Sequence, residues 1–274
     1  MIKESFLELF LDKFRPWMWI NPAVTHDWMS PLLNTLCFTD ESLNSIKPEW
    51  AHWNSYSWRG LEFRNPVGIA GGVDKTAANI NNWWQLGVGF VELGTITPLF
   101  QEPNPGKILD RSIKFQSLWN KMGFPHPGYK ESLFNLDLNF NKRPTPVLIN
   151  LGKNRWTPNE KAHEDYIFLM HHLHSVADIF VINISSPNTK GLRELFQRKN
   201  LKPFLTQIYQ TAVHYQKPIL LKISPDENND DLNLILDISL EVGIDGFIVT
   251  NTTLRRNDQL GFPTDGGVSG RYLA

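Results

Sequence analysis

Cysteine is almost absent from this chain of 274 residues, in which Cys37 is the single thiol. One thiol cannot form an internal disulfide or a cysteine-rich metal site, and its scarcity fits a reducing compartment. The sequence also lacks any run of 18 or more apolar residues, so we expect no segment that crosses a bilayer. A secretory signal is not visible, because the apolar stretch 5–11 is short and contains Glu8.

The chain has no excess of charge of either sign. Its 27 basic and 28 acidic residues give a formal net charge of −1, so no global field draws it to nucleic acid. No Gly-x-Gly-x-x-Gly motif opens a strand–helix unit, which argues against a Rossmann nicotinamide site. The spacing of His163, His171, His172 and His174 fits no standard zinc site, and we predict no metal.

The first 46 residues differ in composition from the rest of the chain. They are rich in Phe and Trp and have few basic residues. The pattern predicts short helices over 2–14 and 23–36, interrupted by Pro16 and Pro22. Two interpretations stay open: these helices pack on the main domain, or they form an amphipathic platform on a membrane surface.

From about residue 57 the chain alternates between short apolar runs and helical segments. This alternation is typical of strand–helix units around a parallel sheet, and it predicts an α/β fold. The expected strands are 66–70, 90–94, 147–150, 180–184, 219–223 and 246–250, and the expected helices are 75–86, 160–176, 201–215 and 230–242. The segment 97–140 is too long for a simple connection, and such insertions often carry function.

Four of the apolar runs are followed by a polar residue, namely Asn150, Asn183, Lys222 and Asn251. A parallel strand is buried on both faces, so its last residue is the first to leave the packed interior. The repeated amide or ammonium therefore lines one end of the sheet, where barrels of strands and helices carry their active sites. Lys222 also needs a partner for its charge, and an anionic ligand is a natural one.

The densest polar segment is 182–193, which follows directly on an apolar run. Its asparagines each offer a donor and an acceptor, which suits a planar ligand with amide edges. The alternative is that its Ser, Asn and Pro residues only form a turn. Glycine-rich turns at 70–75 and 265–270 let the backbone approach a flat ligand closely.

Seven motifs, in order, resemble those of class 2 dihydroorotate dehydrogenases, the quinone-linked flavoenzymes of pyrimidine synthesis. They are Gly-Gly-Val-Asp-Lys, Glu-Leu-Gly-Thr-Ile-Thr-Pro, Asn-Lys-Met-Gly-Phe, Asn-Leu-Gly-Lys-Asn, Asn-Ile-Ser-Ser-Pro-Asn-Thr-Lys-Gly-Leu-Arg, Lys-Ile-Ser-Pro-Asp and Thr-Asn-Thr-Thr. The resemblance runs from about residue 57 to the last residue and is looser before it. Class 1 relatives carry cysteine at the base position, where this chain has Ser186.

The resemblance implies a TIM (β/α)8 barrel, of which this chain would hold about six of the eight strand–helix units. Residues 1–46 would form an N-terminal helical extension at the membrane and quinone site. Residues 47–274 would form the FMN-binding α/β barrel, incomplete at its C-terminus. The family continues through two further units that carry the flavin phosphate site, so we expect a fragment with weak FMN binding and poor stability.

The resemblance also implies roles for individual residues. Ser186 would be the catalytic base, which takes the C5 proton of dihydroorotate while the C6 hydride passes to the flavin. Contacts to FMN would come from Gly71, Gly72, Val73, Asp74, Lys75, Thr95, Asn150, Asn183, Lys222, Thr250 and Gly270. Contacts to dihydroorotate or orotate would come from Lys75, Asn120, Lys121, Met122, Gly123, Phe124, Asn183, Asn188, Asn251 and Thr252.

A quinone would then reoxidise the flavin through a tunnel under the N-terminal helices. The protein would be a monomer, peripheral to the cytoplasmic side of the cell membrane if it is bacterial. Two other functions stay open: another FMN-dependent barrel oxidoreductase that acts on a dihydropyrimidine-like ring, or an inactive fragment without flavin. The chain departs from the family pattern at Pro125-His126-Pro127, where two asparagines normally follow the phenylalanine, and this changes the expected geometry of the substrate loop.

Overall fold

The computed structural model describes residues 20–26, 28, 33, 51–139, 143–189, 191–256 and 258–273. Its centre is a curled parallel sheet of six strands in the order β10-β9-β8-β7-β4-β3. In chain order these are β3 Gly68–Ile69, β4 Phe90–Ile96, β7 Val147–Leu151, β8 Ile179–Asn183, β9 Ile219–Lys222 and β10 Gly246–Ile248. All six predicted strands are present, so the predicted α/β barrel architecture with about six strands is confirmed.

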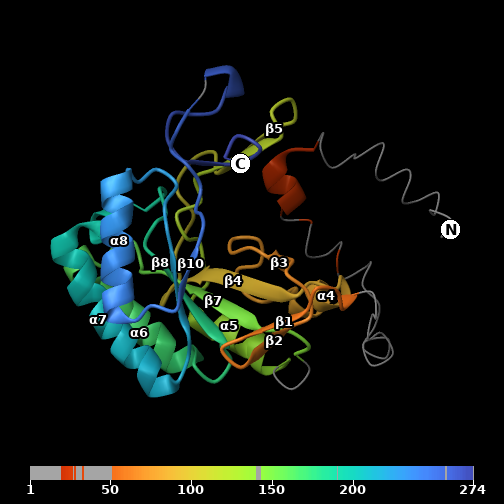
Figure 1. Ribbon diagram of the computed structural model, residues 1–274. Helices are drawn as coiled ribbons and strands as arrows, with labels where there is room; N and C mark the ends of the chain where they lie inside the picture. The colour runs from red at the N-terminus through yellow and green to blue at the C-terminus, as the bar shows by residue number, and fades with distance from the viewer. Residues whose placement is uncertain are drawn as a thin grey trace.

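Helices cover the outer face of this sheet (Figure 1). They include α6 Ala162–Leu173, α7 Arg198–Tyr215 and α8 Asn229–Val242. Every residue of β7 and β8 is buried, as expected for parallel strands that are covered on both faces. Apolar side chains of these strands and helices form the main core, among them Leu169, Leu173, Phe180, Ile182, Leu205, Ile208 and Ile235.

A hairpin lies against the inner face of the sheet. Its strands are β1 Tyr56–Trp58 and β2 Leu61–Phe63, which pair antiparallel. Phe63 packs there on Leu148, Ile179 and Val181, and these four residues form a separate apolar cluster. The inside of the curled sheet is therefore filled with side chains on this side, and a ligand has room only toward the other end of the strands.

The structure corrects the sequence analysis in the insertion and near the end of the chain. The segment 97–140 contains β5 Leu109–Ser112, β6 Ser117–Asn120 and the helix α5 Tyr129–Asp137, none of which was predicted. The supposed glycine-rich turn at 265–270 includes a strand, β11 Gly267–Gly270, which pairs antiparallel with β6. The chain therefore contains a second sheet, β11-β6-β5, and Figure 1 shows its strand β5 above the parallel strands.

Helix ends differ more than strand ends from the predictions. The helix predicted over 75–86 is α4 Ile80–Gln85, so residues 75–79 form a turn instead. At the N-terminus, residues 22–26 are helical, while the predicted helix 2–14 and most of 23–36 lie outside the described residues. Within the described part of the chain, no helix has the length and apolar content needed to span a membrane.

Candidate functional site

Polar side chains from neighbouring strands form one connected layer. Glu92 belongs to β4, Asn150 to β7, Asn183 to β8 and Lys222 to β9, while Asn251 follows β10. Hydrogen bonds connect all five residues across the sheet. The expected proximity of the strand-end residues is therefore observed, because parallel strands bring their carboxyl ends to the same edge.

The ion pair between Lys222 and Glu92 lies at the base of this layer. Nζ of Lys222 is 2.9 Å from Oε1 of Glu92, and the two side chains are only 9% and 5% exposed. Oε2 of Glu92 accepts a hydrogen bond from the backbone N–H of Gly71 at 2.9 Å. Burial alone would raise the pKa of Glu92, but the Lys222 ammonium and the hydrogen bonds from Asn150 and Gly71 outweigh it and lower that pKa.

This pair changes the interpretation of Lys222. We expected an anionic ligand as its partner, whereas the protein itself supplies a carboxylate. The sequence contained one signal for it, since Glu92 is the only charged residue in the apolar run of β4. A buried carboxylate in such a strand needs a cation, and Lys222 is the cation that the fold brings to it.

A chain of oriented amides and hydroxyls extends from Glu92 across the layer. Thr95 Oγ1 donates to Asn150 Oδ1 at 2.7 Å, and Asn183 Nδ2 donates to Thr95 Oγ1 at 3.0 Å. Asn251 Nδ2 in turn donates to Asn183 Oδ1 at 3.1 Å and to Ser185 Oγ at 3.0 Å. Each amide is fixed by its neighbours, so the layer presents a rigid set of donors and acceptors.

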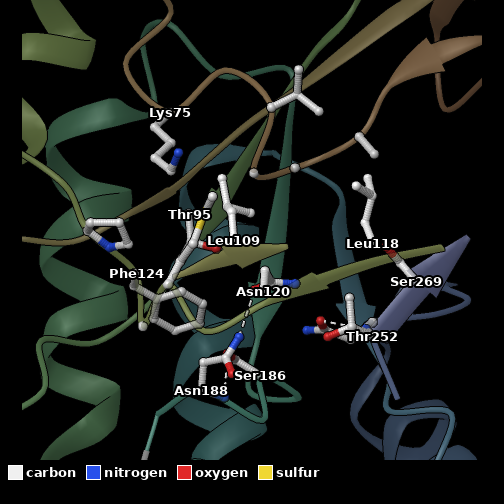
Figure 2. Close-up of a pocket in the computed structure, with 18 of the residues that line it drawn as sticks. Lys75, Thr95, Leu109, Leu118, Asn120, Phe124, Ser186, Asn188, Thr252 and Ser269 are labelled. Carbon is white, nitrogen blue, oxygen red and sulfur yellow. Dashed lines mark hydrogen bonds between the residues drawn. The ribbon is translucent and has the colours of Figure 1, made fainter. Parts of the chain in front are cut away.

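A cavity of about 660 Å³ opens above this layer (Figure 2). Predicted cofactor residues that line it are Gly71, Gly72, Val73, Lys75, Thr95, Asn183, Lys222 and Thr250. Predicted substrate residues that line it are Asn120, Met122, Gly123, Phe124, Asn188, Asn251 and Thr252, together with the predicted base Ser186. Residues far apart in the sequence are thus gathered around one space of the size that small ligands and cofactors occupy.

Four predicted site residues do not line the cavity: Asp74, Lys121, Asn150 and Gly270. The Asp74 carboxylate accepts hydrogen bonds from Asn79 N and Trp83 Nε1, so it faces α4, and burial raises its pKa. Lys121 pairs instead with Asp265 at 2.6 Å.

The other two residues serve the framework of the site. Asn150 lies behind the lining and bonds to Glu92 and Asn183. Gly270 has φ +88, and a Cβ there would come within 2.4 Å of the Gln116 carbonyl oxygen. Both residues therefore support the arrangement of the site without facing the cavity.

Several lining residues were not predicted. The wall formed by β5, β6 and β11 contributes Leu109, Arg111, Leu118 and Ser269. The N-terminal segment contributes Pro22, Thr25 and His26, and His26 Nε2 lies 3.0 Å from the Lys75 ammonium nitrogen. Except for Ser269, which lies in the glycine-rich segment 265–270, these residues belong to no polar cluster or glycine motif, and only the tertiary fold brings them to the site.

The loop that follows β8 carries Ser186, which is buried at the cavity wall. Ser186 Oγ accepts a hydrogen bond from the backbone N–H of Asn188 at 3.2 Å, and Asn188 Nδ2 donates to Asn120 Oδ1 at 2.8 Å (Figure 2). The other amide atom, Asn188 Oδ1, is buried without a hydrogen-bond partner among the described residues. A buried acceptor at a cavity wall is a position for a ligand that donates a hydrogen bond.

The donor set and the glycine turn fit the ring of a flavin. Gly72 lines the cavity with φ +103, and no atom lies within 4 Å of an ideal Cβ built on it, so the backbone there borders open space. A flat ring can approach such a backbone closely. The Asn183 amide and the Lys222 ammonium lie on the same lining, and they suit the polar edge of a flavin.

Comparison with known proteins gives a consistent result. Residues 55–274 match the family model described as dihydroorotate dehydrogenase. A dihydroorotate dehydrogenase (quinone) of Roseiflexus sp. (strain RS-1) is 42% identical over 221 residues, which are 79% of this chain and 61% of that protein. One of Thermus thermophilus is 41% identical over 219 residues, 78% of this chain and 62% of that protein.

Solved structures give the same picture of the fold. The ligand-free dihydroorotate dehydrogenase of Eimeria tenella matches with a TM-score of 0.79 and 32% identity, over 92% of this chain and 76% of that one. The same enzyme in complex with ferulenol matches with a TM-score of 0.77 and 31% identity, over 96% and 75% of the two chains. The chain thus spans a little over three fifths of the length of the two curated relatives above.

Proposed function

The chain belongs to the dihydroorotate dehydrogenase family, and we propose that it oxidises (S)-dihydroorotate to orotate in the biosynthesis of UMP, with FMN as hydride acceptor and a quinone as final electron acceptor. The observation that carries this proposal is the grouping of Ser186 with the amides of Asn120, Asn183 and Asn188 on the lining of one cavity. A ring with several amide edges needs such donors and acceptors around it, and its oxidation needs a base beside the carbon that loses the proton.

Ser186 takes the proton from C5 of dihydroorotate, and C6 loses a hydride, so that the C5=C6 double bond of orotate forms. Serine is a poor base by its own pKa, so it must be well positioned, and a proton relay must carry its own hydroxyl proton away as it takes the C5 proton. The hydrogen bond from Asn188 N to Ser186 Oγ stabilises negative charge on that oxygen and holds it in place. Burial of Ser186 also keeps bulk water away from the proton transfer.

Other residues bind and orient the substrate. Lys75 neutralises its carboxylate, because it is a cavity-lining cation on the turn next to the glycines. Asn188 Oδ1, the buried acceptor without a partner among the described residues, receives a ring N–H. Asn120 and Asn251 contribute their remaining hydrogen-bonding capacity to the ring edges.

FMN, when bound, supplies the acceptor for the hydride. Gly71, Gly72, Thr95, Asn183, Lys222 and Thr250 are the cavity-lining residues that would hold it. Lys222 would keep a positive charge near the ring, and Glu92 fixes that ammonium at 2.9 Å. The amide layer below keeps these groups in one arrangement, so they do not reorganise during the reaction.

The quinone binds at the N-terminal side of the cavity, and this side of the protein faces the membrane. Its lining there includes the apolar side chains of Pro22, Leu109 and Leu118, beside the polar Thr25 and His26. Ile20, Val24 and Trp28 of the same segment are exposed, and such side chains favour a membrane interface. This supports a quinone site under the N-terminal segment of a monomeric protein that is peripheral to the membrane, on the cytoplasmic side if it is bacterial.

The test is a visible absorbance spectrum of the purified chain with FMN, before and after dihydroorotate is added without oxygen. We expect the flavin band to bleach with dihydroorotate and to persist with dihydrouracil, which lacks the carboxylate. Bleaching by dihydrouracil alone would point to an oxidoreductase for a different dihydropyrimidine. Failure of both compounds to bleach a bound flavin would overturn the proposed reaction.

A further inference from the structure

The turn that carries Lys75 has no regular secondary structure, yet the carbonyls of residues 74–76 are each held by a separate donor. Gly94 N donates to the Asp74 carbonyl at 2.9 Å. The His126 ring nitrogen Nε2 lies 3.0 Å from the Lys75 carbonyl. Asn135 Nδ2 donates to the Thr76 carbonyl at 2.9 Å. Two of these three donors come from the insertion, which therefore fixes the main chain from which the Lys75 side chain extends into the cavity (Figure 2).

The hydrogen bonds of His126 define its protonation. Gly128 N donates to Nδ1 of His126 at 3.0 Å, so Nδ1 is an acceptor and carries no proton. Nε2 must then carry the proton of the neutral ring, and it donates to the Lys75 carbonyl. The pKa of His126 is lowered to about 4, mainly because the ring is buried, and the nearby Lys75 charge lowers it further. The hydrogen bond to the Lys75 backbone raises this pKa but does not offset the other two causes. The ring is therefore neutral near pH 7.

The surroundings of His126 leave its ring little freedom to move. His126 is 3% exposed and lies between Pro125 and Pro127, which restrict the backbone on both sides. Its main chain also pairs with Gln101 through two hydrogen bonds, of 2.8 and 3.0 Å. The fully buried Ser132 hydroxyl lies within hydrogen-bond distance of Nε2, at 3.1 Å, and also donates to the Lys75 carbonyl at 3.4 Å, a longer distance than the 3.0 Å from His126. The Pro-His-Pro segment thus presents one fixed donor to the turn.

We propose that His126 is a positioning residue, whose neutral imidazole holds the Lys75 carbonyl so that the Lys75 ammonium is set to bind the carboxylate of the substrate. This inference rests on the proposed function, because it assigns to Lys75 the carboxylate of dihydroorotate or orotate. His126 touches neither substrate nor flavin in this role. It acts only through the main chain of the turn, and the effect of removing it must therefore depend on the presence of Lys75.

The test is isothermal titration calorimetry, which measures the Kd of the FMN-loaded protein for orotate in the parent and in three single variants. His126→Leu removes the nearer of the two side-chain donors to the Lys75 carbonyl, leaves the longer contact from Ser132, and fills a similar volume. His126→Asn keeps a donor and can accept from Gly128 N in an Asx turn, so it serves as the conservative control. Lys75→Met removes the ammonium, and the double variant Lys75→Met/His126→Leu completes a cycle.

We expect His126→Leu to raise the Kd for orotate about tenfold, as the loss of one well-placed hydrogen bond and of the Lys75 geometry implies. His126→Asn should retain most of the parent affinity for orotate. In the Lys75→Met background, His126→Leu should cause little further loss of affinity. In flavin reduction, His126→Leu should raise the KM for dihydroorotate more than it lowers kcat.

Equal losses from His126→Leu with and without Lys75 would show a general structural role and overturn the inference, while the proposed function would stand. Retention of parent affinity by His126→Leu would overturn it as well. Absence of any orotate binding to the parent protein would overturn the proposed function, and the inference with it. Bound FMN and the melting temperature, measured for every variant, separate these outcomes from a failure to fold.

Discussion

Arg193 and Asp226 form an ion pair, with Nη1 of the guanidinium 2.9 Å from a carboxylate oxygen, and this pair joins three loops of the site. Arg193 Nε donates to the Ser185 carbonyl at 2.9 Å, and Nη2 donates to the Thr252 carbonyl at 3.3 Å. The loop after β8, which holds Ser186, is thereby fixed to the loops that follow β9 and β10.

Replacement of Arg193 by Gln should therefore misplace the Ser186 loop. We expect the rate of flavin reduction by dihydroorotate to fall about tenfold to a hundredfold, because small displacements of a reacting group carry costs of this size. Stopped-flow absorbance without oxygen measures that rate. Lys202→Gln is the matched control, because it breaks an exposed ion pair with Glu241 on the helices and should leave the rate unchanged.

Ser186→Ala should keep bound FMN and slow its reduction by dihydroorotate by about 10² to 10⁴. The reason is that alanine removes the proton acceptor but none of the residues that line the flavin part of the cavity. Ser269→Ala, at the β11 part of the cavity lining, tests whether any serine at the site has this effect. A near-normal rate in Ser186→Ala would remove Ser186 from the role of base.

Glu92→Gln should destabilise the protein, because it leaves the buried Lys222 ammonium without its counter-charge. Breaking a buried pair from one side costs about 3–5 kcal/mol, so the melting temperature should fall clearly. The double variant Glu92→Gln/Lys222→Met should recover much of this loss. Differential scanning calorimetry gives the comparison, and an unchanged melting temperature in Glu92→Gln would contradict the assigned pair.

The same pair predicts a pH dependence of stability. The pKa of Glu92 is lower in the folded protein than its ordinary value of 4.5, so the folded state favours the ionised form. Its contribution to stability is therefore fully present above about pH 4.5 and is lost as the pH falls through the folded pKa. Melting temperatures between pH 7 and pH 3 should fall more steeply for the parent than for the double variant.

Deletion of residues 1–46 should impair quinone reduction more than flavin reduction. Pro22, Thr25 and His26 line the cavity, so the deletion removes one of its walls but none of the residues grouped around Ser186. A soluble dye that accepts electrons directly from the flavin is the control, and its reduction should persist. Equal loss of both half-reactions would count against a quinone site at this segment.

The sequence allowed the parallel sheet and its polar edge to be predicted, because both arise from local signals. Apolar runs such as those of β7 and β8 are recognisable without neighbours, and the residues after them mark the strand ends. The predicted start of α4 was wrong because a turn precedes the helix. The Asp74 carboxylate accepts hydrogen bonds from Asn79 N and Trp83 Nε1 and so stabilises that turn. That turn is held by contacts with the insertion, which a local pattern does not contain.

Long-range contacts also explain the residues that were missed. Glu92 was noticeable as the one charge in an apolar run, but its role depends on Lys222, which lies 130 positions later in the sequence. The strands β5, β6 and β11 are short, and β6 pairs with a segment close to the end of the chain. His126 was recognised as a departure from the family pattern, but its role required the position of the Lys75 carbonyl.

The pairing of β6 with β11 affects the order in which parts of the protein can fold during synthesis. Trp119 Nε1 of β6 donates to the Asp265 carbonyl across 146 positions of sequence. On the ribosome, the parallel strands and their covering helices emerge first and can begin to pack, while β6 waits for its partner. Closing so long a loop comes late in folding. The wall of the cavity that bears Leu118 and Ser269 can therefore form only after residues 267–270 have been synthesised, later than the strands and helices of the parallel sheet.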